Sequence, residues 1–539
     1  MRAIFGHKGG MTDMVRVRFA PSPTGQVHIG NIRAAIFNYL FARSQGGQFL
    51  LRVEDTDLER STQEAIDALM AVLAWLELMP DEEPMYQSSQ AEAHLAAAEK
   101  LIAAGHAYRH ARTVSEQPAV FFRLPVDAAV YGGHLRVAGE QTLPLFAGEP
   151  LRVDAAGIQY VGVSRKGKAD PGSCCLAGMA DAVVRDAGGG VLFSLAEALP
   201  SVLAGETVFE STAGVSVTFT RREVCFTDAV KGELAKPLDS MKDLVIVRGD
   251  GSPVFHLANV CDDLAQGITH IIRGDDHVEN TFRHVPLFAA LGGKPPVYGH
   301  LPMIVNAQGK PYSKRDGDAF VGDFQEKGYL PEALFNYLTL LGWSPGDGRE
   351  KMNRDELIAA FSLERVQRAP AQMDLQKCAH LNGQYLQDLP ESLYFADVRE
   401  VLGRCAWAEG LSEARFVALA RMMRPRMQTY ADVLGWEPYV SETFPRDAGA
   451  LKRGLGKAWQ VDALRRIAER LEAGETLGAA REAVATLLEM DDSRLNLPLR
   501  VGLTGLAGGP ELVEVIALLD PQQLAPRIRE TLAILETNS

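Results

Sequence analysis

The first hundred residues alternate between strand-like and helix-like patterns, and this alternation constrains the fold more than any other feature of the chain. Residues 15–19, VRVRF, alternate apolar and polar side chains as a half-buried strand does. After the turn-forming stretch APSPTG, apolar side chains recur at helical spacing over residues 32–40. Residues 48–53, QFLLRV, predict a second strand, and Ser61 with Glu64 predicts a capping box before the next helix. Such alternation is typical of a parallel α/β sheet.

The alternation is interrupted once and later gives way to helices. Residues 114–223 are rich in Gly, Ala and Val, with short β-like runs, and we interpret them as a separate β-containing insertion. Beyond it, residues 269–274, THIIRG, predict a strand, and residues 282–291 predict a helix closed by two glycines. From about Pro331 onward almost every segment has helical periodicity. A chain of 539 residues with this organisation is expected to form several domains.

Cysteine usage, hydropathy and charge bear on the compartment and the partners. The six cysteines are scattered without a C-x-x-C pair, which favours neither a disulfide framework nor a zinc site and makes a reducing cytosol the natural expectation. We find no apolar stretch long enough to cross a bilayer, and the first 14 residues lack the apolar segment of a signal peptide. The formal net charge of −14 is only a weak argument against a nucleic-acid partner, because phosphate binding depends on local basic patches.

A histidine and a glycine mark the start of the first predicted helix, in APSPTGQVHIGN. A helix N-terminus offers free backbone N–H groups and a positive dipole end, which suit a phosphate. Gly30 would let a base or ribose approach the backbone closely, and His28 can donate a hydrogen bond to a phosphate oxygen. The H-x-G pattern alone is weak evidence, and an ordinary surface or capping histidine remains the alternative for His28.

Two cations occupy a glycine-flanked loop in PYSKRDG, residues 311–317. Lys314 and Arg315 can clamp a triphosphate as charge develops on it, since flexible cations stabilise such charge in a closed site. The alternative is a solvated basic loop.

Acidic clusters follow two predicted strands, at residues 54–57 (EDTD) and in RGDDH, residues 273–277. The carboxyl ends of parallel strands are where ligands bind in open α/β sheets. Glu54 can receive an ammonium group, whereas Arg18 and Arg273 can each hold a carboxylate through a planar fork. Salt-bridged loop ends are the alternative for each cluster. Together with the H-x-G and SKR motifs, the clusters indicate a nucleoside triphosphate and an amino acid with two carboxylates.

Six ordered motifs of the chain resemble those of one enzyme family. They are RFAPSPTGxxHIG, LRVEDTD, the stretch from VFHLANVCDD to ITHIIRGDDH, SKRDG, YLPEALFNYLTLLGW and LNGQYL. In this order they resemble bacterial glutamyl-tRNA synthetases, which are class I aminoacyl-tRNA synthetases. The resemblance covers residues 15–110 and 224–390, and more loosely the helical remainder. APSPTG is specific, because the related glutaminyl enzymes have a different sequence there.

The resemblance implies a fold: a class I Rossmann-type α/β catalytic domain with an inserted α+β acceptor-binding domain, followed by an all-α anticodon-binding region. We expect an N-terminal extension at 1–14, the halves of the catalytic domain at 15–110 and 236–310, an enlarged connective insertion at 111–235, a linking domain with the SKR loop at 311–375, and the helical anticodon-binding region at 376–539.

The resemblance also assigns roles to individual residues. It implies that His28 and Lys314 are catalytic. The implied ATP-binding residues are His28, Gly30, Asp276, His277, Ser313, Lys314 and Arg315. The implied glutamate-binding residues are Arg18, Ser22, Glu54, Phe255, Asn259 and Arg273. The chain departs from the family at Pro311, where a lysine is usual, and at Phe255, where a tyrosine is usual.

The implied reaction activates glutamate with ATP, which carries Mg²⁺, and transfers the glutamyl group to the terminal adenosine of tRNA(Glu). We expect a cytoplasmic monomer. We expect no zinc, although many relatives hold one in the insertion, because the corresponding stretch, AYRHART, lacks cysteine. We read His106, His110 and His134 as plain polar residues, and the adjacent Cys174 and Cys175 as core filler.

A cationic turn in the helical half, ARMMRPRMQ at residues 420–428, bears on tRNA choice. The resemblance places Arg426 against the third anticodon base, where it helps to separate glutamate from glutamine tRNA, and we expect Arg424 to contact phosphate. The alternative is a solvated helix end. Two other functions stay open at this point: a glutamyl enzyme that also charges tRNA(Gln), and a non-catalytic tRNA-binding relative.

Overall fold

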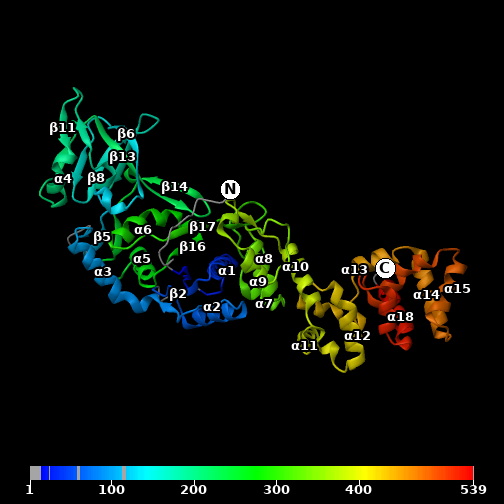
Figure 1. Cartoon of the computed structure of the whole chain (residues 1–539). Coiled ribbons are helices and arrows are strands. Elements are labelled where there is room, and N and C mark those ends of the chain that lie inside the picture. Colours follow the sequence, from blue (N-terminus) through cyan, green and yellow to red (C-terminus); the bar gives the residue numbers. More distant parts are fainter. Residues whose placement is uncertain (1–13, 24, 57–60, 112–116, 538–539) are drawn as a thin grey trace. The chain divides into compact units, whose positions relative to one another are not determined.

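The computed structural model describes residues 14–23, 25–56, 61–111 and 117–537 (Figure 1). The chain forms two compact units. The first comprises Met1–Val321 and Leu338–Met373, and the second comprises Gly322–Tyr337 and Asp374–Ser539. The 1–13 part of the expected extension and Asp57 lie outside the described residues.

The chain begins its first unit with a parallel sheet. Its elements are β1 (Arg16–Phe19), α1 (Ile29–Ser44), β2 (Gln48–Val53), α2 (Gln63–Trp75) and β3 (Met85–Tyr86). Strands β1 and β2, and β2 and β3, pair in parallel, which confirms the predicted alternation. The expected half-buried first strand is wrong: three of its four residues are buried, including Arg18. Parallel sheets are commonly covered on both faces, and Arg18 is polar because it lines the site described below.

The helix after β2 begins one residue later than the capping-box motif predicts. Thr62 is the N-cap, and its hydroxyl oxygen accepts a hydrogen bond from the Ala65 N–H at 3.3 Å. With the cap at Thr62, the third helical residue is Ala65 and not Glu64, so no side chain at that position can reach back to the cap. The predicted box at Ser61 is therefore wrong, although the predicted helix is present.

The second part of the sheet comes from residues beyond the insertion. It contains α5 (Phe255–Ala265), β16 (His270–Gly274), α6 (Val278–Ala290) and β17 (Val297–Leu301). Strands β16 and β17 pair in parallel. The two parts of the sheet meet beside β1, where the Thr269 N–H donates to the Arg16 carbonyl at 2.9 Å. Asn38 on α1 donates to the Ile272 carbonyl at 2.8 Å, so α1 also joins both parts.

The insertion contains β-strands, as predicted, and most of them pair in antiparallel. It contains β6 (Leu135–Pro144), β7 (Leu151–Asp154), β8 (Gly157–Val163), β9 (Ala169–Cys174), α4 (Leu195–Leu203), β12 (Phe209–Ser211), β13 (Ser216–Asp228) and β14 (Gly232–Pro237). It has a hydrophobic core of its own, which includes Cys174. The long strand β13 pairs with β6 and β14, and its last residue, Asp228, pairs in parallel with Tyr298 of β17. The insertion thus ends inside the catalytic sheet.

Helices dominate the rest of the chain, as predicted. A two-strand pair interrupts them: β18 (Ile304–Val305) with β19 (Ala371–Gln372). From α10 (Leu375–Asp388) to α18 (Pro521–Thr537) the second unit is helical around one core that includes Trp436. Gly322–Tyr337 belongs to this unit, although it falls within the range 311–375 expected for the linking domain. The Leu330 N–H donates to Asn382 Oδ1 at 2.8 Å. Among the described helices, none has the length and apolarity needed to span a membrane.

Candidate active site

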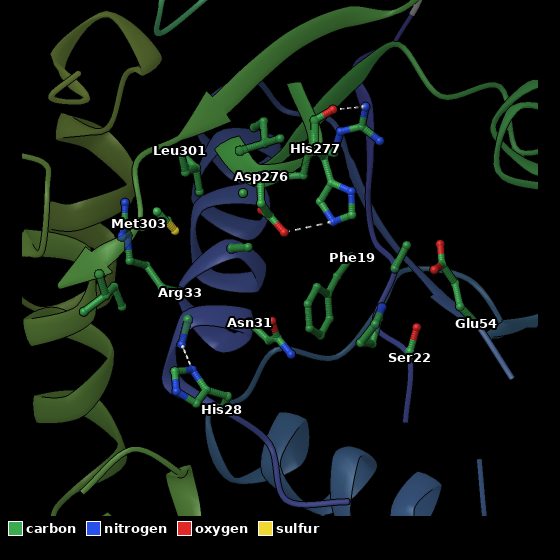
Figure 2. Close-up of a pocket in the computed structure, with 18 of the residues that line it drawn as sticks. Phe19, Ser22, His28, Asn31, Arg33, Glu54, Asp276, His277, Leu301 and Met303 are labelled. Carbon is green, nitrogen blue, oxygen red and sulfur yellow. Dashed lines mark hydrogen bonds and ion pairs between the residues drawn. The ribbon is translucent and has the colours of Figure 1, made fainter. Parts of the chain in front are cut away.

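A pocket of about 710 Å³ lies at the carboxyl ends of β1, β2, β16 and β17 (Figure 2). This is the edge of an α/β sheet at which ligands bind. The pocket brings together most of the residues predicted from the sequence: Arg18, Ser22, His28, Gly30, Glu54, Phe255, Asn259, Arg273, Asp276 and His277. Ser313, Lys314 and Arg315 do not line it, although the preceding Pro311 and Tyr312 do.

His28 caps the first helix and also lines the pocket. Its Nδ1 accepts a hydrogen bond from the Gly30 N–H at 3.0 Å, marked by a dashed line in Figure 2, so the proton of the neutral ring lies on Nε2. Burial lowers the pKa of His28, and a hydrogen bond with the Tyr312 backbone opposes this shift. A Cβ at Gly30 would lie 3.2 Å from His28 Nδ1, so the glycine also makes room for the cap. The capping and ligand-binding interpretations are therefore compatible.

The SKR loop is an exposed tight turn. Asp316 Oδ2 accepts hydrogen bonds from the Ser313 N–H at 3.0 Å and from the Ser313 hydroxyl at 2.9 Å. Gly317, at φ 140°, follows in a backbone conformation that favours glycine. Lys314 and Arg315 are exposed and form no ion pair with another described residue. Their predicted contact with ATP stays a prediction.

Arg18 is nearly buried at the end of β1. Its Nε donates to Asp263 Oδ1 at 2.9 Å, and the same oxygen accepts a hydrogen bond from Arg52 Nη1 at 2.6 Å. Arg52 also lies 3.7 Å from Glu54 Oε1 and 3.9 Å from Asp262 Oδ2, so carboxylates of the protein balance its charge. Only the Nε of Arg18 is hydrogen-bonded to another described residue.

Arg273, at the end of β16, has a buried nitrogen without a partner. Its Nη2 donates to Thr281 Oγ1 at 2.8 Å and its Nε to His300 Nε2 at 3.4 Å. Nη1 is buried and has no hydrogen-bond partner among the described residues. Burial lowers the pKa of Arg273 to about 10, so the guanidinium stays charged at neutral pH. A buried cationic donor is costly unless something pairs with it, and a ligand carboxylate would do so.

Glu54 brings a carboxylate to the pocket. Its Oε1 accepts a hydrogen bond from Asn259 Nδ2 at 2.9 Å and lies 3.7 Å from Arg52 Nη2. Burial raises the pKa of Glu54, and the charges of Arg52 and Arg18 oppose the shift. A bound ammonium group would favour the ionised form further.

The other described carboxylates of these clusters divide between loop ends and pocket. Asp55 accepts from the Ser88 N–H and hydroxyl at 2.8 and 2.6 Å, and Asp275 pairs with Lys231 at 2.6 Å. For these two the salt-bridged or hydrogen-bonded loop end is the correct interpretation. Asp276 and His277 lie within 3.6 Å of one another at the pocket wall, as the dashed line in Figure 2 shows.

The structure adds charged residues that the sequence analysis missed. Arg33 of α1 lines the pocket and donates to the Pro302 carbonyl at 2.9 Å, and its buried Nε and Nη2 have no hydrogen-bond partner in the described part of the chain. Arg52 is fully buried within β2. The available signal was a charge inside an apolar segment, since buried charges are normally paired or functional.

His134 and the adjacent cysteines are the insertion residues that bear on the zinc question. His134 Nδ1 lies 3.1 Å from the Cys225 carbonyl, and Cys174 and Cys175 are buried. Burial raises the pKa of Cys174 to about 12, which disfavours the thiolate that a metal needs. Within the described chain no group of three metal-ligating side chains comes together. Residues 112–116 of this region lie outside the described ranges, and the absence of zinc stays a prediction.

The arginines of the C-terminal turn differ in their contacts. Arg424 donates to the carbonyls of Leu386 at 3.0 Å, Gln387 at 3.0 Å and Leu389, which closes the end of α10. Its guanidinium carbon lies 4.7 Å from the centre of the Tyr394 ring. Arg421 pairs with Glu391 at 2.6 Å. Arg426 is exposed, with a single long contact of 3.5 Å to the Met422 carbonyl.

Two family models match the chain, one over the residues that line the pocket and one over most of the helical unit. The family model "tRNA synthetases class I (E and Q), catalytic domain" matches residues 14–117 and 213–380, and "Anticodon binding domain" matches residues 385–532. The glutamate–tRNA ligase 1 of Gluconobacter oxydans is 34% identical over 536 residues, covering 96% of this chain and 98% of its own length. The corresponding ligase 1 of Acidiphilium cryptum is 36% identical over 523 residues, covering 95% and 98%.

A solved structure extends the likeness to the fold. The crystal structure of a glutamate tRNA ligase from Elizabethkingia meningosepticum in complex with its amino acid aligns with a TM-score of 0.67 and 24% identity. The alignment covers 97% of this chain and 99% of that chain. The catalytic family model leaves residues 118–212 unmatched, which is most of the β-rich insertion.

Proposed function

Because the chain belongs to the glutamate–tRNA ligases of class I, we propose that its strand-end pocket is the site where glutamate and ATP react. The activity of the chain is the charging of tRNA with glutamate, at the expense of ATP. The observation that carries the assignment of the pocket is the buried Nη1 of Arg273, which has no hydrogen-bond partner within the described ranges.

The glutamate end comprises the two arginines and Glu54. Arg273 and Arg18 hold the two substrate carboxylates, each by charge-assisted hydrogen bonds. Glu54, held by Asn259, receives the ammonium group. Ser22 and Phe255 complete the wall of this end.

The nucleotide end comprises the start of α1, the residues after β16 and the SKR loop. His28 and Gly30 bind phosphate, and Asp276 and His277 contact ribose and base. Ser313, Lys314 and Arg315 act on the phosphates from the loop. Mg²⁺ enters with the nucleotide as part of the substrate. The support is the presence of the first four residues in one pocket.

The chemistry requires no side-chain nucleophile. A glutamate carboxylate oxygen attacks the α-phosphorus of ATP, the bond to the bridging oxygen breaks, and pyrophosphate leaves. The terminal 2′-hydroxyl of the tRNA then attacks the acyl carbon and AMP leaves. Positioning and charge stabilisation account for the acceleration, and both arise from the arginines, His28 and the loop lysine.

The remaining regions take the roles expected from their order in the chain. Residues 111–235 bind the acceptor end, residues 311–375 link, and residues 376–539 bind the anticodon, for which the match to the anticodon-binding family is the support. We place the enzyme in the cytoplasm as a monomer without zinc. Light scattering tests the monomer, and elemental analysis showing one zinc per chain would overturn the metal assignment.

Aminoacylation with labelled glutamate tests the proposal directly. Purified tRNA(Glu) and tRNA(Gln) are offered separately, with ATP–pyrophosphate exchange measured in the presence of each. Charging of tRNA(Glu) alone supports a discriminating enzyme, whereas charging of both identifies a non-discriminating one. No charging and no exchange would leave only tRNA binding.

A further inference from the structure

A buried aspartate–histidine pair lies directly behind Arg273. Asp228 Oδ2 is 2.6 Å from His300 Nδ1, and both side chains are 0% exposed. His300 lies on β17 and Asp228 ends β13, the strand that returns from the insertion. Neither residue lines the pocket, so neither is a ligand of the substrates in the site described above.

Backbone groups fix the Asp228 carboxylate. Its Oδ1 accepts from the N–H groups of Val230 at 2.9 Å and Lys231 at 2.8 Å, and its Oδ2 accepts from the His300 N–H at 3.1 Å. Burial acts to raise the pKa of Asp228, but hydrogen bonds from His300 and Lys231 outweigh it and the pKa is lowered. Asp228 is therefore an anion whose orientation does not depend on any ligand.

The ionised Asp228 determines the tautomer of His300. The Nδ1–H donates to the carboxylate, so Nε2 carries no proton and accepts hydrogen bonds. Nε2 lies 3.1 Å from the hydroxyl of Thr281 and 3.4 Å from Nε of Arg273. The Thr281 hydroxyl oxygen in turn accepts from Arg273 Nη2 at 2.8 Å, and its own proton faces two acceptors, His300 Nε2 at 3.1 Å and the His277 carbonyl at 3.4 Å.

The His300 ring and the Thr281 hydroxyl hold two of the three nitrogens of Arg273, and the third is left for a ligand. Nε donates to His300 and Nη2 to Thr281, while Nη1 has no partner among the described residues. The guanidinium carbon also lies 5.6 Å from the centre of the Tyr298 ring, which restricts the plane of the group. Burial lowers the pKa of His300, and its Asp228 hydrogen bond opposes the shift. A neutral imidazole is what the neighbouring guanidinium requires.

We propose that Asp228 and His300 are positioning residues for the amino acid: they fix the Arg273 guanidinium so that Nη1 meets a substrate carboxylate and selects glutamate over glutamine. The inference rests on the proposed role of Arg273 in carboxylate binding. A guanidinium held by His300 Nε2, the Thr281 hydroxyl and the His277 carbonyl cannot turn to suit an uncharged amide. A misplacement of about 1 Å can cost about 10²-fold in rate.

Asp228→Asn is the sharpest test, because it reverses the tautomer while keeping the shape. The amide oxygen must stay where Oδ1 receives two backbone N–H groups, so the amide NH₂ faces His300 Nδ1. The imidazole proton then moves to Nε2, where it opposes the donors of Arg273. We expect the KM for glutamate to rise about tenfold or more, with the KM for ATP within about twofold. The kcat/KM preference for glutamate over glutamine should fall in parallel.

Two further variants separate positioning from simple loss of stability. His300→Gln keeps an acceptor and should retain more glutamate affinity than His300→Leu, which has none. His94→Gln is the matched control, since His94 and Asp262 form another buried pair at 2.6 Å that does not contact Arg273. Thermal unfolding is measured for every variant. The control should lose stability without the rise in glutamate KM.

The measured KM values separate the positioning role of Asp228 and His300 from the carboxylate role of Arg273. A glutamate KM within twofold of wild type in folded Asp228→Asn and His300→Leu overturns the proposal, as does an equal rise in the KM for ATP. Arg273→Ala is measured beside them. Unchanged glutamate KM in that variant would refute the carboxylate role of Arg273 itself. A large effect there with none at Asp228 and His300 would refute the positioning role alone.

Discussion

At the strand ends, Arg18 and Arg273 are nearly buried and held by side chains from other elements, whereas Lys314 and Arg315 stand exposed on a turn. The strand-end arginines are in place before any ligand arrives, because Asp263, Thr281 and His300 hold them. The loop cations have no such support among the described residues.

The difference fits the two tasks of the site. Selecting one amino acid requires charges at fixed positions, since a preorganised site rejects a ligand that lacks the matching group. Following a phosphate chain whose charge moves during the reaction suits cations that can shift. The cost of the first arrangement is desolvation, which the buried partners offset. The variants below test whether fixed and mobile cations affect different kinetic constants.

The largest effect is expected from Arg273→Ala. Removing a buried cation that pairs with a substrate carboxylate costs about 4 kcal/mol, or about 10³-fold in kcat/KM for glutamate. The KM for ATP should stay nearly unchanged, because we assign the arginine to the glutamate end of the pocket. Steady-state aminoacylation with each substrate varied in turn measures both. Arg273→Lys is the control that keeps the charge and loses the fork. A collapse of ATP affinity with an unchanged glutamate KM would show that the two ends had been reversed.

Lys314→Ala should have the next largest effect, and on a different constant. The loss of one contact to developing phosphate charge typically slows a reaction by about 10²–10³-fold, or about 3–4 kcal/mol. The kcat should fall far more than the KM for glutamate rises, because the contact forms in the transition state. Single-turnover formation of the adenylate in the presence of tRNA measures the step. Lys294→Ala is the matched control, because Lys294 is exposed and lies just before Val297, where β17 begins. Near-normal kcat in Lys314→Ala would remove the loop from the mechanism.

The residues that were predictable from sequence are those whose role follows from position along one strand or helix. Glu54 comes directly after one predicted strand and Arg273 lies near the end of another, and parallel strands bring their carboxyl ends to one edge. The Asp228–His300 contact joins residues 72 apart in sequence, and Arg33 meets the Pro302 carbonyl across 269 residues. No local pattern encodes such contacts, because they depend on how separate elements pack.

The C-terminal turn shows the same limit within three residues. The sequence analysis expects both Arg424 and Arg426 to contact tRNA, but Arg424 turns back onto the carbonyls at the end of α10 while Arg426 stays exposed. An arginine whose donors are engaged by the protein has few left for phosphate. The phosphate contact of Arg424 stays a prediction. The structure adds a second role that sequence did not indicate, which is to hold the carbonyls at the end of α10.

Substitutions of Arg424 and Arg426 extend the comparison between hydrogen-bonded and exposed cations to the second unit. Arg426→Gln should relax the preference against tRNA(Gln) by about 1–3 kcal/mol, since an arginine fork can read a base edge. Arg424→Gln should weaken both tRNAs alike and also lower the thermal stability, because it releases three carbonyls. The ratio of kcat/KM for the two tRNAs and the unfolding temperature are the measurements. Equal charging of both tRNAs by the wild type would show that Arg426 is not sufficient for discrimination.

Phe255→Tyr should have the smallest effect, and it tests how complete the fixed end of the pocket already is. Phe255 begins α5, lines the pocket, and lies with its ring centre 6.0 Å from that of His277. The family's usual tyrosine would add one hydroxyl, and a hydrogen bond to a bound ligand contributes about 1 kcal/mol net. We expect the KM for glutamate to fall about fivefold, since 1.4 kcal/mol corresponds to a factor of ten. The KM for ATP is the internal control and should not move. A rise in the KM for glutamate would show instead that the arginines and Glu54 already position the substrate where a hydroxyl does not fit, and that this end of the pocket is closed to further contacts.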